Sequence, residues 1–217
     1  MFQEAHDLTN LDVSNWDTRS MYNMHQMFTN ASSLASLDVS RWDTSNVTDM
    51  YSLFRGTSSL MVLDLSGWDT GRVANMGRMF QNTNLTSVGD ISSWNTGSVR
   101  RMHAMFQDAS NLTSTTVDVS NWNTANVYRF QNMFQGSGFT SLDLSGWDTR
   151  NASDMNQIFS NTPLEELTLG QNFVFHGLPN GPGLRAGTWH GGGYVLSSAE
   201  LMLHHNASPA LVTWVAE

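Results

Sequence analysis

The chain has 217 residues, no cysteine and a formal net charge of -9, and only 13% of its residues are charged. Without cysteine it has no disulfides and no thiolate metal site, and without a single lysine it is poorly suited to bind a nucleic-acid backbone. It contains no apolar run of the roughly 20 residues that would cross a bilayer, so we expect no membrane span in this segment.

The chain opens inside a repeated unit, because residues 1–8 align with residues 27–34. Six tryptophans follow at steps of 26, 26, 26, 28 and 25 residues, and a phenylalanine stands twelve positions after each of them. These two columns are Trp16, Trp42, Trp68, Trp94, Trp122 and Trp147, with Phe28, Phe54, Phe80, Phe106, Phe134 and Phe159. Such a period indicates stacked repeats, so we expect both columns to form structural core and the chain to be part of a longer one.

Within one copy, two patterns follow each other. Leu37–Ser40 alternates apolar and polar residues, which predicts a short strand. Val47, Met50 and Phe54 then fall on one helical stripe, which predicts a short helix. The pair Asp43–Thr44 stands just before this stripe, where its oxygens are suited to cap a helix N-terminus. Each copy is therefore expected to be strand, turn, helix and return loop.

After residue 164 the repeat ends. Residues 167–169 suggest a strand, 177–193 a Gly/Pro-rich loop, 198–203 a short helix capped by one of two serines, and 211–215 a final strand. We divide the chain into a repeat unit, residues 1–164, which starts in mid-repeat, and a C-terminal cap, residues 165–217, which seals the last repeat. The alternative is that this second unit is a small ligand domain that uses Trp189 and Trp214.

The stretches Leu37–Thr44 and Asn121–Val127 carry a further indication, because their pattern resembles the BspA-like leucine-rich-repeat surface proteins of bacteria. The resemblance covers the repeat unit and implies an α/β solenoid, leucine-rich-repeat-like, with six full repeats of about 26 residues, each a short parallel strand and a short helix. It also implies an exported protein of the bacterial cell surface that binds host proteins, other cells or glycans. It names no specific ligand.

The outward positions of the predicted strands give the candidate ligand site. We expect an acidic, hydroxyl-bearing face there, suited to a basic partner, a glycan or calcium. The competing interpretation is a solvated repeat face on which each aspartate belongs to a local turn. The residues concerned are Asp12, Asp38, Asp64, Asp90, Asp118 and Asp143, with Ser40, Ser66, Ser92 and Ser120.

Other side chains give no sharper signal. The arginines vary in repeat position and form no basic stripe, and His204–His205 lacks a third ligand, so we expect no metal site and, calcium apart, no cofactor. No catalytic motif occurs, and without lysine and cysteine two classes of nucleophile are missing, so we expect no enzyme. Two hypotheses remain, an adhesin-type module, monomeric, that binds a host or neighbouring-cell protein or glycan, and a structural spacer without a ligand of its own.

Overall fold

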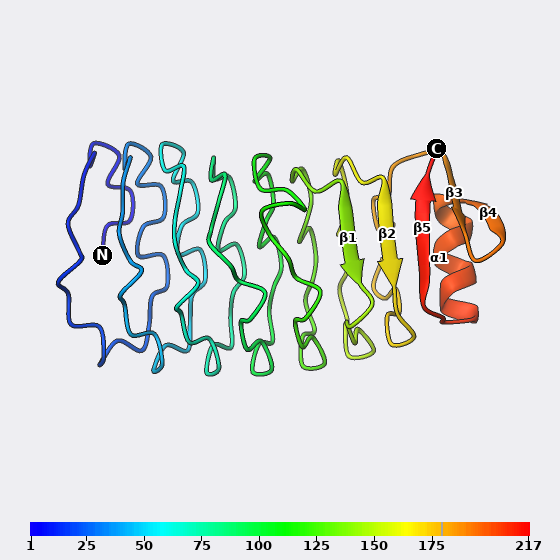
Figure 1. The fold of residues 1–217 in the computed structure, drawn as a ribbon, viewed down its shortest axis with the longest axis horizontal. Coiled ribbons are helices and arrows are strands. Elements are labelled where there is room, and N and C mark those ends of the chain that lie inside the picture. The colour runs from blue at the N-terminus through cyan, green and yellow to red at the C-terminus, as the bar shows by residue number, and fades with distance from the viewer. Residues whose placement is uncertain (179) are drawn as a thin grey trace.

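A computed structural model, which describes residues 1–178 and 180–217, arranges the copies as a row of stacked layers (Figure 1). Parallel bridges and backbone hydrogen bonds connect each layer to the next, between residues about one repeat apart. Residues 1–9 pack against the first layer, and the C-terminal unit covers the last. Layers 1 to 6 comprise residues 10–35, 36–61, 62–86, 87–113, 114–140 and 141–165.

The expected α/β leucine-rich-repeat solenoid is wrong. Among the residues described there is one helix, it lies outside the layers, and layers 1 to 5 contain turns and isolated bridges in place of the predicted strand and helix. The regular strands form one mixed five-stranded sheet near the C-terminus. The elements are β1 (Ser141–Leu144), β2 (Glu166–Leu169), β3 (Thr188–Gly191), β4 (Tyr194–Ser197), α1 (Ser198–Ala207) and β5 (Val212–Ala216).

The apolar stripe does not form a helix because some of its residues adopt the left-handed backbone conformation. Ser52, between Met50 and Phe54, has a φ of 54°, and Gly56 has a φ of 70°. A right-handed helix requires negative φ at every residue, so these positions break it into successive turns. The same column has positive φ in every layer: Gln26, Ser52, Arg78, Ala104, Asn132 and Gln157.

This conformation directs backbone amides toward the neighbouring layer. Met50, Ser52, Phe54 and Gly56 donate to carbonyls of layer 3 over 2.9–3.0 Å, and the next layer repeats the pattern. We call these segments the turn ladder. It comprises residues 24–30, 50–56, 76–82, 102–108, 130–136 and 155–161.

The Asp–Thr pairs are also not helix caps. The carboxylate of Asp43 accepts from the amide of Ser45 at 3.0 Å, which closes a local turn. The hydroxyl of Thr44 donates to the carbonyl of Asp69 in the next layer at 2.9 Å, and Thr44 is buried. Thr70, Thr96 and Thr124 make the same bond to their next layers, so this column connects layers.

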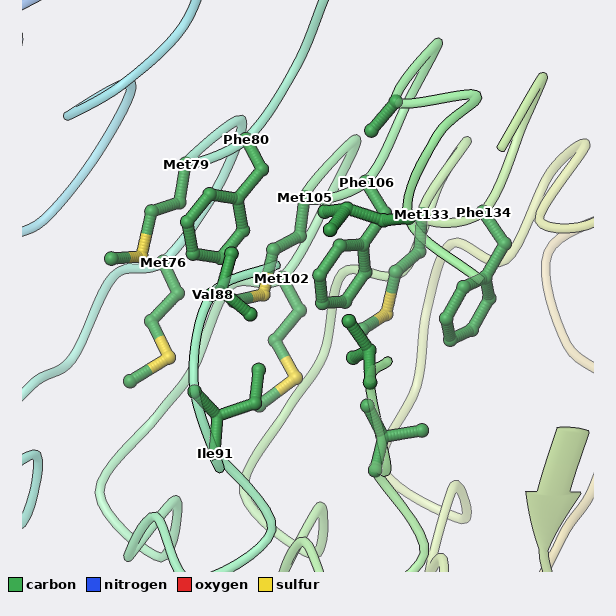
Figure 2. Close-up of a cluster of buried hydrophobic side chains, with 14 of the residues drawn as sticks. Met76, Met79, Phe80, Val88, Ile91, Met102, Met105, Phe106, Met133 and Phe134 are labelled. Carbon is green, nitrogen blue, oxygen red and sulfur yellow. The ribbon is translucent and has the colours of Figure 1, made fainter. Parts of the chain in front are cut away.

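The predicted core columns are confirmed. The six phenylalanines are buried, and neighbours in the column stack with centroids 5.6–6.2 Å apart. Five of the six tryptophans are buried and Trp16, in the first layer, is half-buried. Each buried indole donates to a carbonyl of the preceding layer, as Trp122 does to Ile91 at 3.0 Å. Figure 2 shows the column of Phe80, Phe106 and Phe134.

The segments predicted as strands line the other side of this core. Val88 and Ile91 point toward Met76 and Met102 in Figure 2. On this side single bridges join layers 1 and 2, at Asn10–Ser36, and layers 3 and 4, at Val62–Ser87, and a regular strand pair forms between β1 and β2. The buried pair Val88 and Ile91 has two residues between its members, whereas the equivalent buried pair Leu63 and Leu65 of layer 3 has one, so layer 4 has one extra residue here. Gly89, whose φ is 74°, lies in this bulge.

The C-terminal unit continues the sheet across residue 165. The strand order is β1-β2-β5-β3-β4, with β1 and β2 parallel and the other pairs antiparallel. Helix α1 begins after Ser197, which forms a capping box with Glu200, as the sequence suggests. Strand β3 lies inside the segment predicted as loop, and β4 was not predicted. The part of the chain that the structure describes contains no helix long and apolar enough to span a membrane.

Candidate functional site

The predicted ligand residues lie together along the strand side of the layers, and we call this surface the Asp–Ser face. All six aspartates are exposed, but each accepts a hydrogen bond from the amide two residues later. In Asp38 the same oxygen accepts from the amide and the hydroxyl of Ser40, at 3.1 and 2.7 Å. The turn interpretation is therefore correct for each residue taken alone.

The serines differ from one another. Ser40 and Ser92 donate to their own aspartates, whereas the hydroxyl of Ser66 accepts from the amide of Asp90 at 2.8 Å. Ser120 contributes its amide to Asp118. Three of the four predicted serine hydroxyls thus form hydrogen bonds within the chain, two with a carboxylate and one with a backbone amide.

These hydrogen bonds fix the charge of the face. The serine hydroxyl and then the serine amide lower the pKa of Asp12, and the same two contacts at their own serines lower the pKa of Asp38 and Asp90. A lowered carboxyl pKa keeps the ionised form dominant well below neutral pH. Asp12, Asp38 and Asp90 are therefore held as carboxylates, each with one oxygen in a turn.

The carboxylates do not converge on a common point. Across residues 1–178 and 180–217, no group of three or more acidic or histidine side chains is placed to hold a metal ion. Hard cations such as calcium take six to eight oxygen ligands, which one carboxylate per layer does not supply.

The most prominent hollow on this face lies across layers 1 to 3. It has a volume of about 610 Å³, and its lining combines apolar side chains with two carboxylates. Met61 and Val62 are 45% and 59% exposed, in a surface otherwise rich in polar residues. Its lining is Asn10, Leu11, Asp12, Ala35, Ser36, Leu37, Asp38, Met61 and Val62.

Unpaired backbone accompanies this hollow. Leu63 and Leu65 pair with layer 4, but within the described chain no backbone hydrogen bond joins residues 36–40 to residues 62–66. The amide of Ser40 donates to Asp38 and the carbonyl of Val39 accepts from Trp42 and Trp68, so the backbone groups at the hollow that can meet another polar group are those of residues 36–38. Two smaller hollows on the same face, of about 420 and 140 Å³, lie at layers 4 to 6 and lack large exposed apolar side chains.

The remaining sequence candidates are structural. The tryptophans of the repeats lie in the core, and so do Trp189 and Trp214, which are 0% and 1% exposed. Trp214, with Tyr194 and His204, lines a separate hollow of about 350 Å³ in the C-terminal unit. His205 is buried there, beside the carbonyl of Phe173 at 3.0 Å.

One group was missed in the sequence. Arg78, Arg101 and Arg129 differ in repeat position by up to three residues, yet the electrostatic surroundings of His103 include all three. These three arginines thus lie near one another, although the arginines as a whole vary in repeat position. Part of this group could have been predicted from the repeat alignment, because Arg101 and Arg129 occupy the same repeat position.

Comparison with known proteins gives one family. A protein-family model described as "Mycoplasma protein of unknown function, DUF285" matches residues 1–88 and again residues 58–169. The two matches together cover the six layers and β2. Neither the curated proteins nor the solved structures yielded a match.

Proposed function

Because the chain belongs to the DUF285 family of Mycoplasma proteins of unknown function, we propose a function from its surface: it is an extracellular, adhesin-type binding module on a bacterial surface. The resemblance of its repeats to BspA-like surface proteins supports this location and role. The observation that carries the proposal is the hollow across layers 1 to 3, where exposed Met61 and Val62 lie beside Asp12 and Asp38.

The partner that fits this hollow is an extended, basic segment of a host or neighbouring-cell protein. An apolar side chain of the segment would cover Met61 and Val62, since exposed apolar patches rimmed by polar groups mark interaction sites. Lysine or arginine beside it would meet the carboxylates of Asp12 and Asp38, whose pKa values are lowered. Its backbone would meet backbone groups of residues 36–38, which do not pair with layer 3.

The alternative function is a structural spacer. The continuous ladder of backbone bonds from layer 1 to layer 6 favours it, because such a row is well suited to hold other domains apart. A spacer has no need of exposed apolar residues within a polar face, and for this reason we place it second.

A peptide-display experiment separates these functions. The chain is immobilised and panned with a random peptide library, and we expect a consensus that combines one apolar residue with neighbouring lysine or arginine. Met61→Ser with Val62→Ser removes the apolar contact. Because each half-exposed side chain contributes about 1 kcal/mol when covered, we expect a loss of affinity of more than tenfold.

The matched control uses the same face. Asp12→Asn with Asp38→Asn retains the oxygen that closes each turn but removes two charges, and we expect affinity to fall about threefold to tenfold. Asp118→Asn with Asp143→Asn makes the same chemical change at the smaller hollow, and affinity should stay within twofold. If no consensus emerges, or if both pairs reduce binding equally, the spacer is the better description.

A further inference from the structure

A second charged surface lies on the turn-ladder side of the layers, across the core from the Asp–Ser face. Three arginines on successive layers form it, and we call it the arginine cluster: Arg78 in layer 3, Arg101 in layer 4 and Arg129 in layer 5. Arg101 and Arg129 are exposed and Arg78 is half-buried. Layers joined by parallel bridges are about 4.8 Å apart, so Arg101 and Arg129, which share a column, lie on neighbouring layers, and Arg78 lies three repeat positions further along in layer 3.

The charge of this cluster is balanced only in part, because Asp154 is the parallel-bridge partner of Arg129 on its other side. In the part of the chain described, none of its three guanidinium groups forms an ion pair, whereas Arg19 and Arg150 each pair with an aspartate at 2.7 and 2.6 Å. Arg101 and Arg129 are direct partners in a parallel bridge. Like charges placed directly opposite each other destabilise a pair of strands. The arrangement therefore opposes folding in a protein of net charge -9, where carboxylates are plentiful.

Aromatic side chains hold the guanidinium groups in place. Arg78 lies over the ring of Tyr51, 5.9 Å from its centroid, and Arg101 lies 5.7 Å from the centroid of Tyr128. The Nε of Arg101 also donates to the hydroxyl of Tyr128 at 2.6 Å. Groups held in this way lose little conformational freedom on binding a ligand, which increases affinity.

A neutral histidine lies between the arginines. His103 packs against Tyr51, with centroids 5.8 Å apart, and rests on Gly77, where a Cβ atom would collide with its ring. Burial and the charges of the three arginines lower the pKa of His103 to about 4, although Asp154 acts in the opposite direction. Its Nδ1 and the Nε of Arg78 are buried without a hydrogen-bond partner among the residues described.

We propose that the arginine cluster binds an anionic polysaccharide through its sulfate or carboxylate groups. Guanidinium groups bind such oxyanions through paired hydrogen bonds. Single-stranded nucleic acid fits less well, because it needs free aromatic faces for stacking. Here Tyr51 is covered by Arg78, His25 and His103, and Tyr128 is covered by Arg101. This site is separate from the hollow across layers 1 to 3, and its ligand is independent of the one proposed there.

The test measures binding of the full chain to immobilised heparin, which carries sulfate and carboxylate, and to hyaluronan, which carries carboxylate alone. We expect the chain to bind heparin. Binding to hyaluronan as well would show that the carboxylate groups alone are sufficient ligands. Combining Arg78→Gln, Arg101→Gln and Arg129→Gln should lower the affinity at least about tenfold. The matched control combines Arg19→Gln, Arg41→Gln and Arg150→Gln, which removes the same charge elsewhere, and should change affinity by less than twofold.

Several results would overturn the proposal. These are no binding to either polysaccharide, an equal loss in both triple variants, and single-stranded DNA binding more tightly than heparin in a cluster-dependent way. The single variant Arg101→Gln, at an exposed position, serves if the triple variant does not fold, and it should lower affinity about threefold to tenfold. Loss of binding in the cluster variant with unchanged peptide binding at the hollow would show that the two sites are separate.

Discussion

Replacing Ser52 by glycine tests whether the backbone at Ser52 is left-handed, because a helix and the turn ladder predict changes of opposite sign in the free energy of unfolding. In the structure Ser52 has a φ of 54°, and its buried hydroxyl has no hydrogen-bond partner among the described residues. Its backbone amide donates to Gly77 in either variant. Ser52→Gly therefore removes a left-handed non-glycine residue and an unsatisfied hydroxyl without disturbing the ladder.

The expected magnitude follows from four contributions to the free energy of unfolding. Relief of the left-handed conformation contributes about 1–2 kcal/mol, and loss of the unsatisfied hydroxyl contributes about 1 kcal/mol or more. The greater freedom of glycine in the unfolded chain costs about 0.4–1 kcal/mol, and the lost methylene costs about 0.8 kcal/mol. The sum is a stabilisation of about 1 kcal/mol, or roughly 2–4 °C in Tm for a chain of this size.

Thermal denaturation followed by circular dichroism measures this change. In a helix, serine to glycine would lower stability by about 0.5 kcal/mol, so the sign alone decides. The matched control is Ser58→Gly, at an exposed position of the same layer for which no positive φ is found, and it should be neutral or slightly destabilising. A fall in Tm for Ser52→Gly would refute the ladder.

Three further outcomes are expected. Thr96→Val removes the buried hydroxyl that donates to the carbonyl of Asn123 at 3.0 Å, and urea denaturation should show a loss of about 1–2 kcal/mol, whereas an unchanged midpoint would contradict its role between layers. Because the pKa of His103 is lowered from 6.5 to about 4, the unfolded chain binds an extra proton between these values, so the free energy of unfolding should fall as pH falls from about 6.5 to 4. His103→Gln should weaken that dependence, and an equally steep pH profile in the variant would contradict the assignment. Gly77→Ala should displace the ring of His103 and raise its pKa toward the ordinary value, which an NMR titration measures. An unchanged pKa in this variant would contradict the contact between the ring and Gly77.

The sequence predicted the positions that are buried but not the backbone that buries them. Periodicity identified the columns of Trp42 and Phe54, since every layer must fill the same core space. It could not identify the hand of the residues between Met50 and Phe54. Apolar spacing of three and four residues fits a helix. It also fits successive turns in which an amide donates to the carbonyl three residues earlier, as the amide of Leu53 donates to Met50.

The candidate site was predicted in part. The alternation around Asp38 correctly indicated an outward carboxylate, and the turn that holds it follows from the serine two residues later. The hollow could not be predicted, because it depends on which neighbouring segments leave their backbone unpaired. The arginine cluster escaped because Arg78 and Arg101 occupy different repeat positions and meet through Tyr51, His103 and the turns between them.

The location of a bound peptide tests the proposed function most directly. A peptide selected by display would be added to isotopically labelled protein, and amide chemical shifts would be followed by NMR. We expect shifts confined to the lining of the hollow, residues 10–12, 35–38 and 61–62. Shifts confined to the C-terminal unit or the arginine cluster, with residues 35–38 unchanged, would contradict a binding site on the Asp–Ser face.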